Sequence, residues 1–120
     1  MNEAIKNGYE KAMYFLGNYY IDGKFVEKDE KKGAELLTRC IFHNDPHAYL
    51  SLAICYRDGK GVEQSIPRFV ECLKQCALLG NSVISKLLFE CYCEGSYVKP
   101  DAAEARKWLK LYYDQIRGKK

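Results

Sequence analysis

The chain has 120 residues, a formal net charge of +3 and a hydrophobic fraction of 48%. This length allows one compact domain with a continuous apolar core. Acidic and basic side chains alternate along most of the sequence, so it lacks the basic stripe that follows a phosphate backbone, and nucleic-acid binding is not expected. Neither a run of about 20 apolar residues nor a secretory signal is present, which predicts a cytoplasmic protein without a membrane span.

Apolar residues at three- and four-residue intervals predict a series of amphipathic helices. The first helix is expected from Tyr9 to Ile21, after the remnant of a preceding helix that ends at Gly8. Asp29 is placed to cap the second helix. Asp45, Ser65 and Asp101 precede later helical segments in the same way, and prolines 46 and 67 fit first helical turns. The later helices are expected over residues 46–57, 66–79, 82–94 and 102–116.

The same residue types recur every 36 residues along the chain. A period of this length is typical of stacked supersecondary units that cannot bury their apolar faces alone. We therefore predict an all-α, right-handed solenoid forming one domain over residues 1–120, with helix-loop-helix repeats at about 8–43, 44–79 and 80–116 and a basic tail at 117–120. The positions in register are Leu16, Leu52 and Leu88; Tyr20, Tyr56 and Tyr92; Gly23, Gly59 and Gly95; and Val26, Val62 and Val98.

These residues resemble the Sel-one-like repeat family, whose members are related to the tetratricopeptide repeat and have a longer loop between the two helices. The family pattern combines an alanine, an L-G-x-x-Y motif, a G-x-G-V loop and a D-x-x-K-A helix start. The resemblance implies a TPR-like α-solenoid that binds other proteins. Small residues usually allow the two helices of a repeat to approach; the facing pairs expected here are Gly17 with Gly33, Ala53 with Phe69, and Phe89 with Ala105.

Four of the six cysteines also follow the repeat, with Cys40 matching Cys76 and Cys55 matching Cys91. On helices, reduced cysteines pack as small hydrophobic residues, which is the interpretation we favour. Disulfides joining Cys40 to Cys55 and Cys76 to Cys91 are the alternative, and they would require an oxidising compartment.

The sequence offers little for catalysis or for cofactor binding. Cys40, His43 and His47 lie close together around Asp45, but no second ligand cluster completes a four-ligand zinc site. The glycines at 59 and 61 follow a helix rather than a strand, so they do not form a phosphate-binding loop. No spacing predicts an activated serine or cysteine nucleophile. We therefore expect no metal, no cofactor and no enzymatic activity.

In the related tetratricopeptide stack, the first helix of each repeat lines a concave groove, and this groove is the usual partner site. Carried over to this chain, the groove is mixed in charge and partly apolar, which suits a protein or peptide ligand. An adaptor or a toxin-neutralising immunity protein is the role implied by the family. The expected groove residues are Lys11, Tyr14, Asn18, Ile21 and Asp22; His47, Leu50, Ile54, Arg57 and Asp58; and Val83, Lys86, Glu90, Cys93 and Glu94.

Two other hypotheses remain open at this point. The terminal helices, including Tyr112 and Tyr113, could be covered by a second copy in a homodimer or by further repeats of a longer scaffold. The second hypothesis is a hydrolase acting on cell-wall or lactam-like substrates, which would require a proton-transfer residue with a shifted pKa in a pocket.

Overall fold

The computed structural model describes residues 3–41 and 46–118, with side chains from residue 11 onward. The regular secondary structure of this part of the chain consists of helices, which are joined by loops. The thinnest dimension of the molecule is 20 Å, about two helix diameters, so the helices form two layers. This architecture is the α-solenoid of helix-loop-helix repeats expected from the sequence. The helices are α1 (Glu3–Asp22), α2 (Glu30–Ile41), α3 (Pro46–Asp58), α4 (Ile66–Leu78), α5 (Ser82–Glu94) and α6 (Ala102–Ile116).

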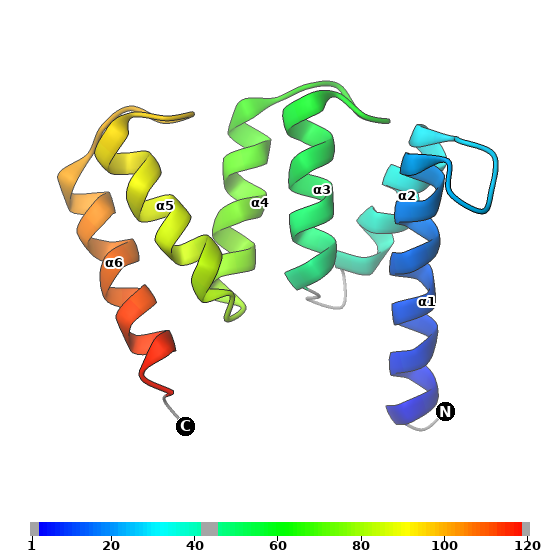
Figure 1. Cartoon of the computed structure of the whole chain (residues 1–120), viewed down its shortest axis with the longest axis horizontal. Helices are drawn as coiled ribbons and strands as arrows, with labels where there is room; N and C mark the ends of the chain where they lie inside the picture. The colour runs from blue at the N-terminus through cyan, green and yellow to red at the C-terminus, as the bar shows by residue number, and fades with distance from the viewer. Residues whose placement is uncertain (1–2, 42–45, 119–120) are drawn as a thin grey trace.

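The helices follow one another along the long axis of the molecule from α1 to α6 (Figure 1). The most extensive contacts lie within the pairs α1 with α2, α3 with α4, and α5 with α6, and smaller interfaces join α2 to α3 and α4 to α5. The three long loops inside the repeats all lie at one edge of the stack, at the top of Figure 1. Each helix pair therefore buries one side against its neighbour, as stacked repeats require.

Side-chain caps fix where the second helix of each repeat begins. Asp29 accepts a hydrogen bond from the Lys32 backbone N–H at 3.1 Å, and Ser65 accepts one from the Arg68 N–H at 3.3 Å. Asp101 accepts two, from backbone N–H groups at 3.0 and 3.2 Å. These contacts confirm the caps expected at the three positions. Pro46 is the first residue of α3, as predicted, whereas Asp45 lies outside the described residues.

The prediction that a helix ends at Gly8 is wrong. Helix α1 continues from Glu3 through Gly8 to Asp22 without interruption. Glycine permits the left-handed conformation that ends a helix but does not impose it, and inside a helix it costs only about 1 kcal/mol. The residue in register, Gly80, has a φ of 115° in the turn between α4 and α5, where two packed helices reverse the chain.

The first repeat is held together by two glycines that face each other, as expected. A Cβ atom added to Gly33 would lie 2.6 Å from the Gly17 carbonyl oxygen, so α1 and α2 approach closely at this point. In the second repeat, Ala53 and Phe69 are both buried in the apolar core. In the third repeat, Ala105 is buried in the core and Phe89 packs against the core cluster.

Each long loop contains the same two left-handed positions. The first is glycine in every repeat: Gly23, Gly59 and Gly95 have φ values of 72°, 73° and 81°. The second is filled by Phe25, Gly61 and Tyr97, with φ values of 68°, 77° and 67°. A side chain in this conformation costs about 1–2 kcal/mol. Two aromatic residues therefore occupy backbone sites that favour glycine.

All six cysteines lie in the described part of the chain, and they are thiols rather than disulfides. Five are buried, and Cys93 is exposed. Burial raises the pKa of the Cys55 and Cys72 thiols to about 11. At neutral pH these two side chains are uncharged, which suits their position in the core and removes the thiolate that a nucleophile would need.

Candidate protein-binding surface

The expected groove residues lie on the first helices of the three repeats, α1, α3 and α5. We call this surface the first-helix face; its members are the fifteen residues predicted from the sequence, apart from Ile21, which is corrected below. It carries exposed groups of both charge signs, including Lys11, Asp58 and Glu90. Exposed apolar side chains lie on the same helices, among them Phe15, Ile54 and Val83. The surface therefore combines apolar area with charged groups.

A pocket of about 370 Å³ lies between α1 and α3 and is lined by Lys11, Tyr14, Phe15 and His47. The Tyr14 ring centroid lies 5.3 Å from that of Phe15 and 5.9 Å from that of His47. Such spacing is typical of packed aromatic pairs. The pocket is open to solvent and can accept one apolar side chain beside the Lys11 ammonium group.

At the end of α3, Arg57 lies beside an aromatic contact that joins the second and third repeats. Its guanidinium lies 6.0 Å from the Phe69 ring centroid on α4, and that ring packs edge-on against Tyr97 with centroids 4.8 Å apart. Arg57 also donates hydrogen bonds of 3.0 and 3.3 Å to the two carboxylate oxygens of Asp58. These bonds raise the pKa of Arg57 and lower that of Asp58. Because α3 ends at Asp58, the pair of Arg57 and Asp58 lies at the loop edge of the stack.

One of the expected groove residues does not lie at the surface. Ile21 is buried, because its side chain fills the space beside Gly33 at the crossing of α1 and α2. Ile21 therefore belongs to the packing between helices, and the prediction that it lines a groove is wrong. Leu50 is half-buried and packs against the core cluster, as Tyr14 does, so its place in the groove stays a prediction.

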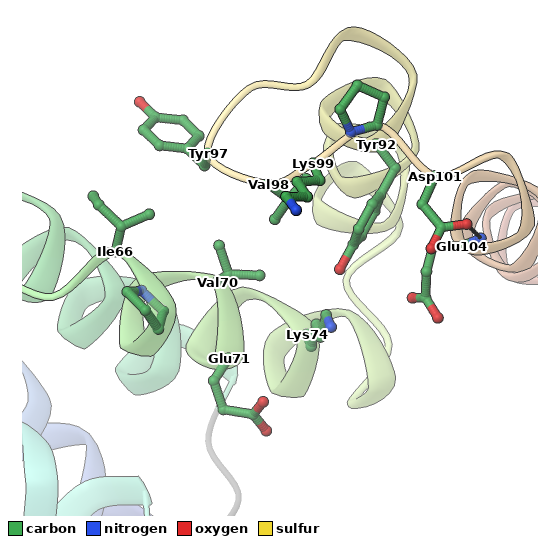
Figure 2. Close-up of a pocket in the computed structure, with 12 residues that line it drawn as sticks. Ile66, Val70, Glu71, Lys74, Tyr92, Tyr97, Val98, Lys99, Asp101 and Glu104 are labelled. Carbon is green, nitrogen blue, oxygen red and sulfur yellow. Dashed lines mark hydrogen bonds between the residues drawn. The ribbon is translucent and has the colours of Figure 1, made fainter.

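Sequence reasoning missed a larger cavity at the loop edge. It measures about 660 Å³ and lies between α4 and the loop that joins α5 to α6. Figure 2 shows Val70 and Lys74 of α4 directed toward Tyr97, Val98 and Tyr92 of the following repeat. The Lys74 ammonium lies 5.6 Å from the Tyr92 ring centroid. A smaller cavity of about 500 Å³ occupies the equivalent position one repeat earlier, lined in part by Ala34, Gly61 and Val62. The two cavities are related by the 36-residue repeat, which is the only trace of them in the sequence.

The described residues offer no metal site and no membrane span. Within residues 3–41 and 46–118, no group of three His, Cys, Asp or Glu side chains is arranged to hold a metal ion. His43, part of the Cys40 and His47 cluster considered above, lies outside these residues. In the same part of the chain, no helix is long and apolar enough to cross a bilayer.

Stacked helix pairs with a mixed apolar and charged face define a helical-repeat protein of the solenoid class. The profile of the Sel1 repeat matches residues 10–39, 46–81 and 85–115, and the chain belongs to this family. Sel1 repeats generally act as non-catalytic modules for protein–protein interaction. No curated protein matches the chain at a significant level.

The solved structures that are similar to the chain include two bacterial proteins. A Sel1 repeat protein from Oxalobacter formigenes has 24% sequence identity and a TM-score of 0.73, over 88% of this chain and 43% of that protein. The protein c5321, a protective antigen of uropathogenic Escherichia coli strains with an SLR fold, has 26% identity and a TM-score of 0.75, over 97% of this chain and 24% of that protein. The chain thus spans less than half the length of both relatives.

Proposed function

We propose that the first-helix face binds another protein or peptide, and that the chain acts without catalysis. The proposal is carried by the exposure of Phe15, Ile54 and Val83 on three successive first helices, and by the pocket that Tyr14 and Phe15 line between α1 and α3. Apolar side chains cost free energy when they face water, and clusters of them bordered by charges are characteristic of interaction surfaces. A bound polypeptide would cover this area.

The two kinds of residue on this face have different roles in the proposal. Tyr14 and Ile54 are the anchors, because aromatic and aliphatic side chains in partly enclosed positions supply most of the affinity at protein interfaces. Lys11, Lys86 and Glu90 are exposed charges on the rim. Charges on the rim contribute more to the choice of partner and to the association rate than to the affinity. The mixture of signs favours a polypeptide that carries both charges over a polyanion.

We further propose that the biological role is that of an adaptor or of an immunity protein that neutralises a toxin in the cytoplasm. In both roles the chain acts by occupying a surface of its partner, which requires only a rigid, complementary face. The buried thiols of Cys55 and Cys72 support a role without covalent chemistry, since a pKa of about 11 keeps them protonated at neutral pH.

The test begins with partners that co-purify with the chain from its native host and are identified by mass spectrometry. The affinity of a purified partner is then measured by calorimetry for the unmodified chain and for a variant with Tyr14→Ala, Ile54→Ala and Arg57→Ala. We expect at least about tenfold weaker binding, equivalent to about 1.4 kcal/mol. Leu78→Ala, on the exposed side of α4, is the matched control. Unchanged affinity of the triple variant would move the site away from the first-helix face.

Self-association through the terminal helices is a second candidate function. It is favoured by the exposure of Phe15 and Leu16 on α1 and of Tyr113 and Ile116 on α6. Terminal repeats of a solenoid need polar outer faces to remain soluble alone, and these four side chains depart from that rule. Measurement of the mass by light scattering over a range of concentrations distinguishes a homodimer from a monomer.

A further inference from the structure

A cavity of about 310 Å³ lies between α3 and α4, and Ile41 at the end of α2 contributes to its lining. Its volume is at the lower end of the range of about 300–1,000 Å³ that is usual for ligand pockets. The cavity is therefore large enough for one small ring system. It is lined by Ile41, Tyr49, Leu52, Tyr56, Arg68, Glu71, Cys72 and Gln75.

One residue of this lining, Cys72, has a much larger counterpart in the next repeat. The positions in register at 36, 72 and 108 hold leucine, cysteine and tryptophan. Trp108 is 1% exposed and belongs to the core cluster together with Tyr92, the counterpart of Tyr56. Tyr92 is only 8% exposed, whereas Tyr56 is half-buried. The cavity therefore lies where the third repeat carries a buried indole ring.

Larger side chains on the other helices take up only part of this space. Ile41 occupies the position of Ala77, and Tyr49 that of Ser85, where the third repeat has small, fully buried residues. In the third repeat these small residues leave room for the ring of Trp108, whereas their larger counterparts narrow the cavity without filling it. The remaining space has aromatic and aliphatic walls, which suit a flat apolar ring.

Polar side chains of α4 lie at the opening of the cavity. Arg68 and Glu71 line it and are exposed, and the Arg68 guanidinium lies 5.8 Å from the Tyr56 ring centroid. Glu71 accepts a hydrogen bond of 3.1 Å from the side-chain amide of Gln75. Figure 2 shows Glu71 directed away from Tyr97, which belongs to the larger cavity described above. The opening therefore offers hydrogen-bond donors and an acceptor beside an apolar interior.

We propose that this cavity binds an aromatic side chain, tryptophan in particular, of a partner polypeptide. The indole ring takes the space that Trp108 fills one repeat later. The Trp108 indole N–H donates a hydrogen bond of 3.2 Å to the Glu104 carboxylate, and Glu71 can accept the same bond from a bound indole. Arg68 and Gln75 donate hydrogen bonds to carbonyl groups of the partner's backbone, which a free aromatic compound lacks.

This site goes beyond the function proposed above, because none of its lining residues belongs to the first-helix face. The test is an NMR titration of the isotope-labelled full chain with the capped tripeptide Ala-Trp-Ala and, separately, with indole. The backbone amide signals of Tyr49, Leu52 and Cys72 should shift, whereas those of Tyr14 and His47, in the pocket between α1 and α3, should not. We expect half-saturation below about 1 mM for the tripeptide and at an at least threefold higher concentration for indole.

Three variants at two cysteines test whether the cavity is the binding site. Cys72→Trp fills the cavity with an indole ring of the chain itself and should weaken tripeptide binding by at least about tenfold. Cys93→Trp adds the same side chain at an exposed position and is the matched control, which should bind like the unmodified chain. Cys72→Ala leaves the cavity open and should also bind. Circular dichroism checks folding, and Cys72→Phe replaces Cys72→Trp if that variant is unfolded.

Three results would overturn the proposal. The first is a titration of the unmodified chain in which the signals of the cavity residues do not move, which needs no variant to be decisive. The second is undiminished binding by folded Cys72→Trp, which would place the ligand elsewhere. The third is indole binding as tightly as the tripeptide, which would assign the cavity to a free aromatic compound instead of a polypeptide.

Discussion

Replacing Phe69 by alanine should remove the main packing element between the second and third repeats. The side chain is 4% exposed, belongs to the core cluster and packs edge-on against Tyr97 at 4.8 Å. Loss of its burial costs about 3 kcal/mol, and loss of the aromatic pair about 0.5–1.5 kcal/mol. A residual cavity adds to this, so the free energy of unfolding should fall by about 3–5 kcal/mol.

Urea denaturation followed by circular dichroism at 222 nm measures this loss. Phe25→Ala is a matched control, because it removes the same atoms from a ring that is largely exposed, and it should cost less than about 1 kcal/mol. A double-mutant cycle with Tyr97→Ala should give a coupling energy of about 1 kcal/mol between the two rings. A loss below about 1 kcal/mol for Phe69→Ala would refute the conclusion that this residue holds the two repeats together.

Three further substitutions or conditions test the packing of the stack. A Cβ atom on Gly61 would overlap the Glu30 carbonyl oxygen, so Gly61→Ala should lower the unfolding free energy by about 2 kcal/mol or more; an unchanged thermal midpoint would contradict this close approach. Asp101→Ala removes the acceptor for two backbone N–H groups and should cost about 1 kcal/mol in urea, whereas Asp101→Asn should retain most of the cap. Burial raises the pKa of the Cys55 and Cys72 thiols from the ordinary 9.0 to about 11 in the folded chain, so the unfolded chain loses these protons first and stability should fall as the pH rises from about 9 to 11. Alanine at both positions should remove that part of the pH dependence, and a profile identical to that of the unmodified chain would contradict burial as the cause.

The repeat interval and the helix limits, apart from the boundary expected at Gly8, could be predicted because they depend on local properties. Apolar residues at helical spacing define a buried stripe, and a capping side chain supplies hydrogen bonds that are confined to one turn. Helix α5 accordingly spans Ser82–Glu94, as expected, and α6 starts after the Asp101 cap. The facing glycines at 17 and 33 were also predicted, from the small residues that the family resemblance implies inside each helix pair.

The candidate surface was only partly predictable, because exposure depends on what lies across from a residue. Ile21 falls on the expected groove positions, yet it is buried, since glycine at position 33 leaves a space that the isoleucine fills. Leu16, by contrast, has the pattern of a core leucine and is exposed, since the described residues include no helix before α1. The cavity between α4 and the last long loop was missed because it is formed by segments from two repeats.

The sequence by itself determined the number of repeats, the helices within them and the residues that hold each pair together, because these follow from periodicity and from contacts between near neighbours in the chain. The tertiary structure decided which equivalent residues are covered. Leu16 and Leu52 occupy the same place in the pattern, but among the described residues only Leu52 has a preceding helix against it. Burial is a property of the whole stack, so identical motifs become core in the middle of the molecule and exposed surface at its ends.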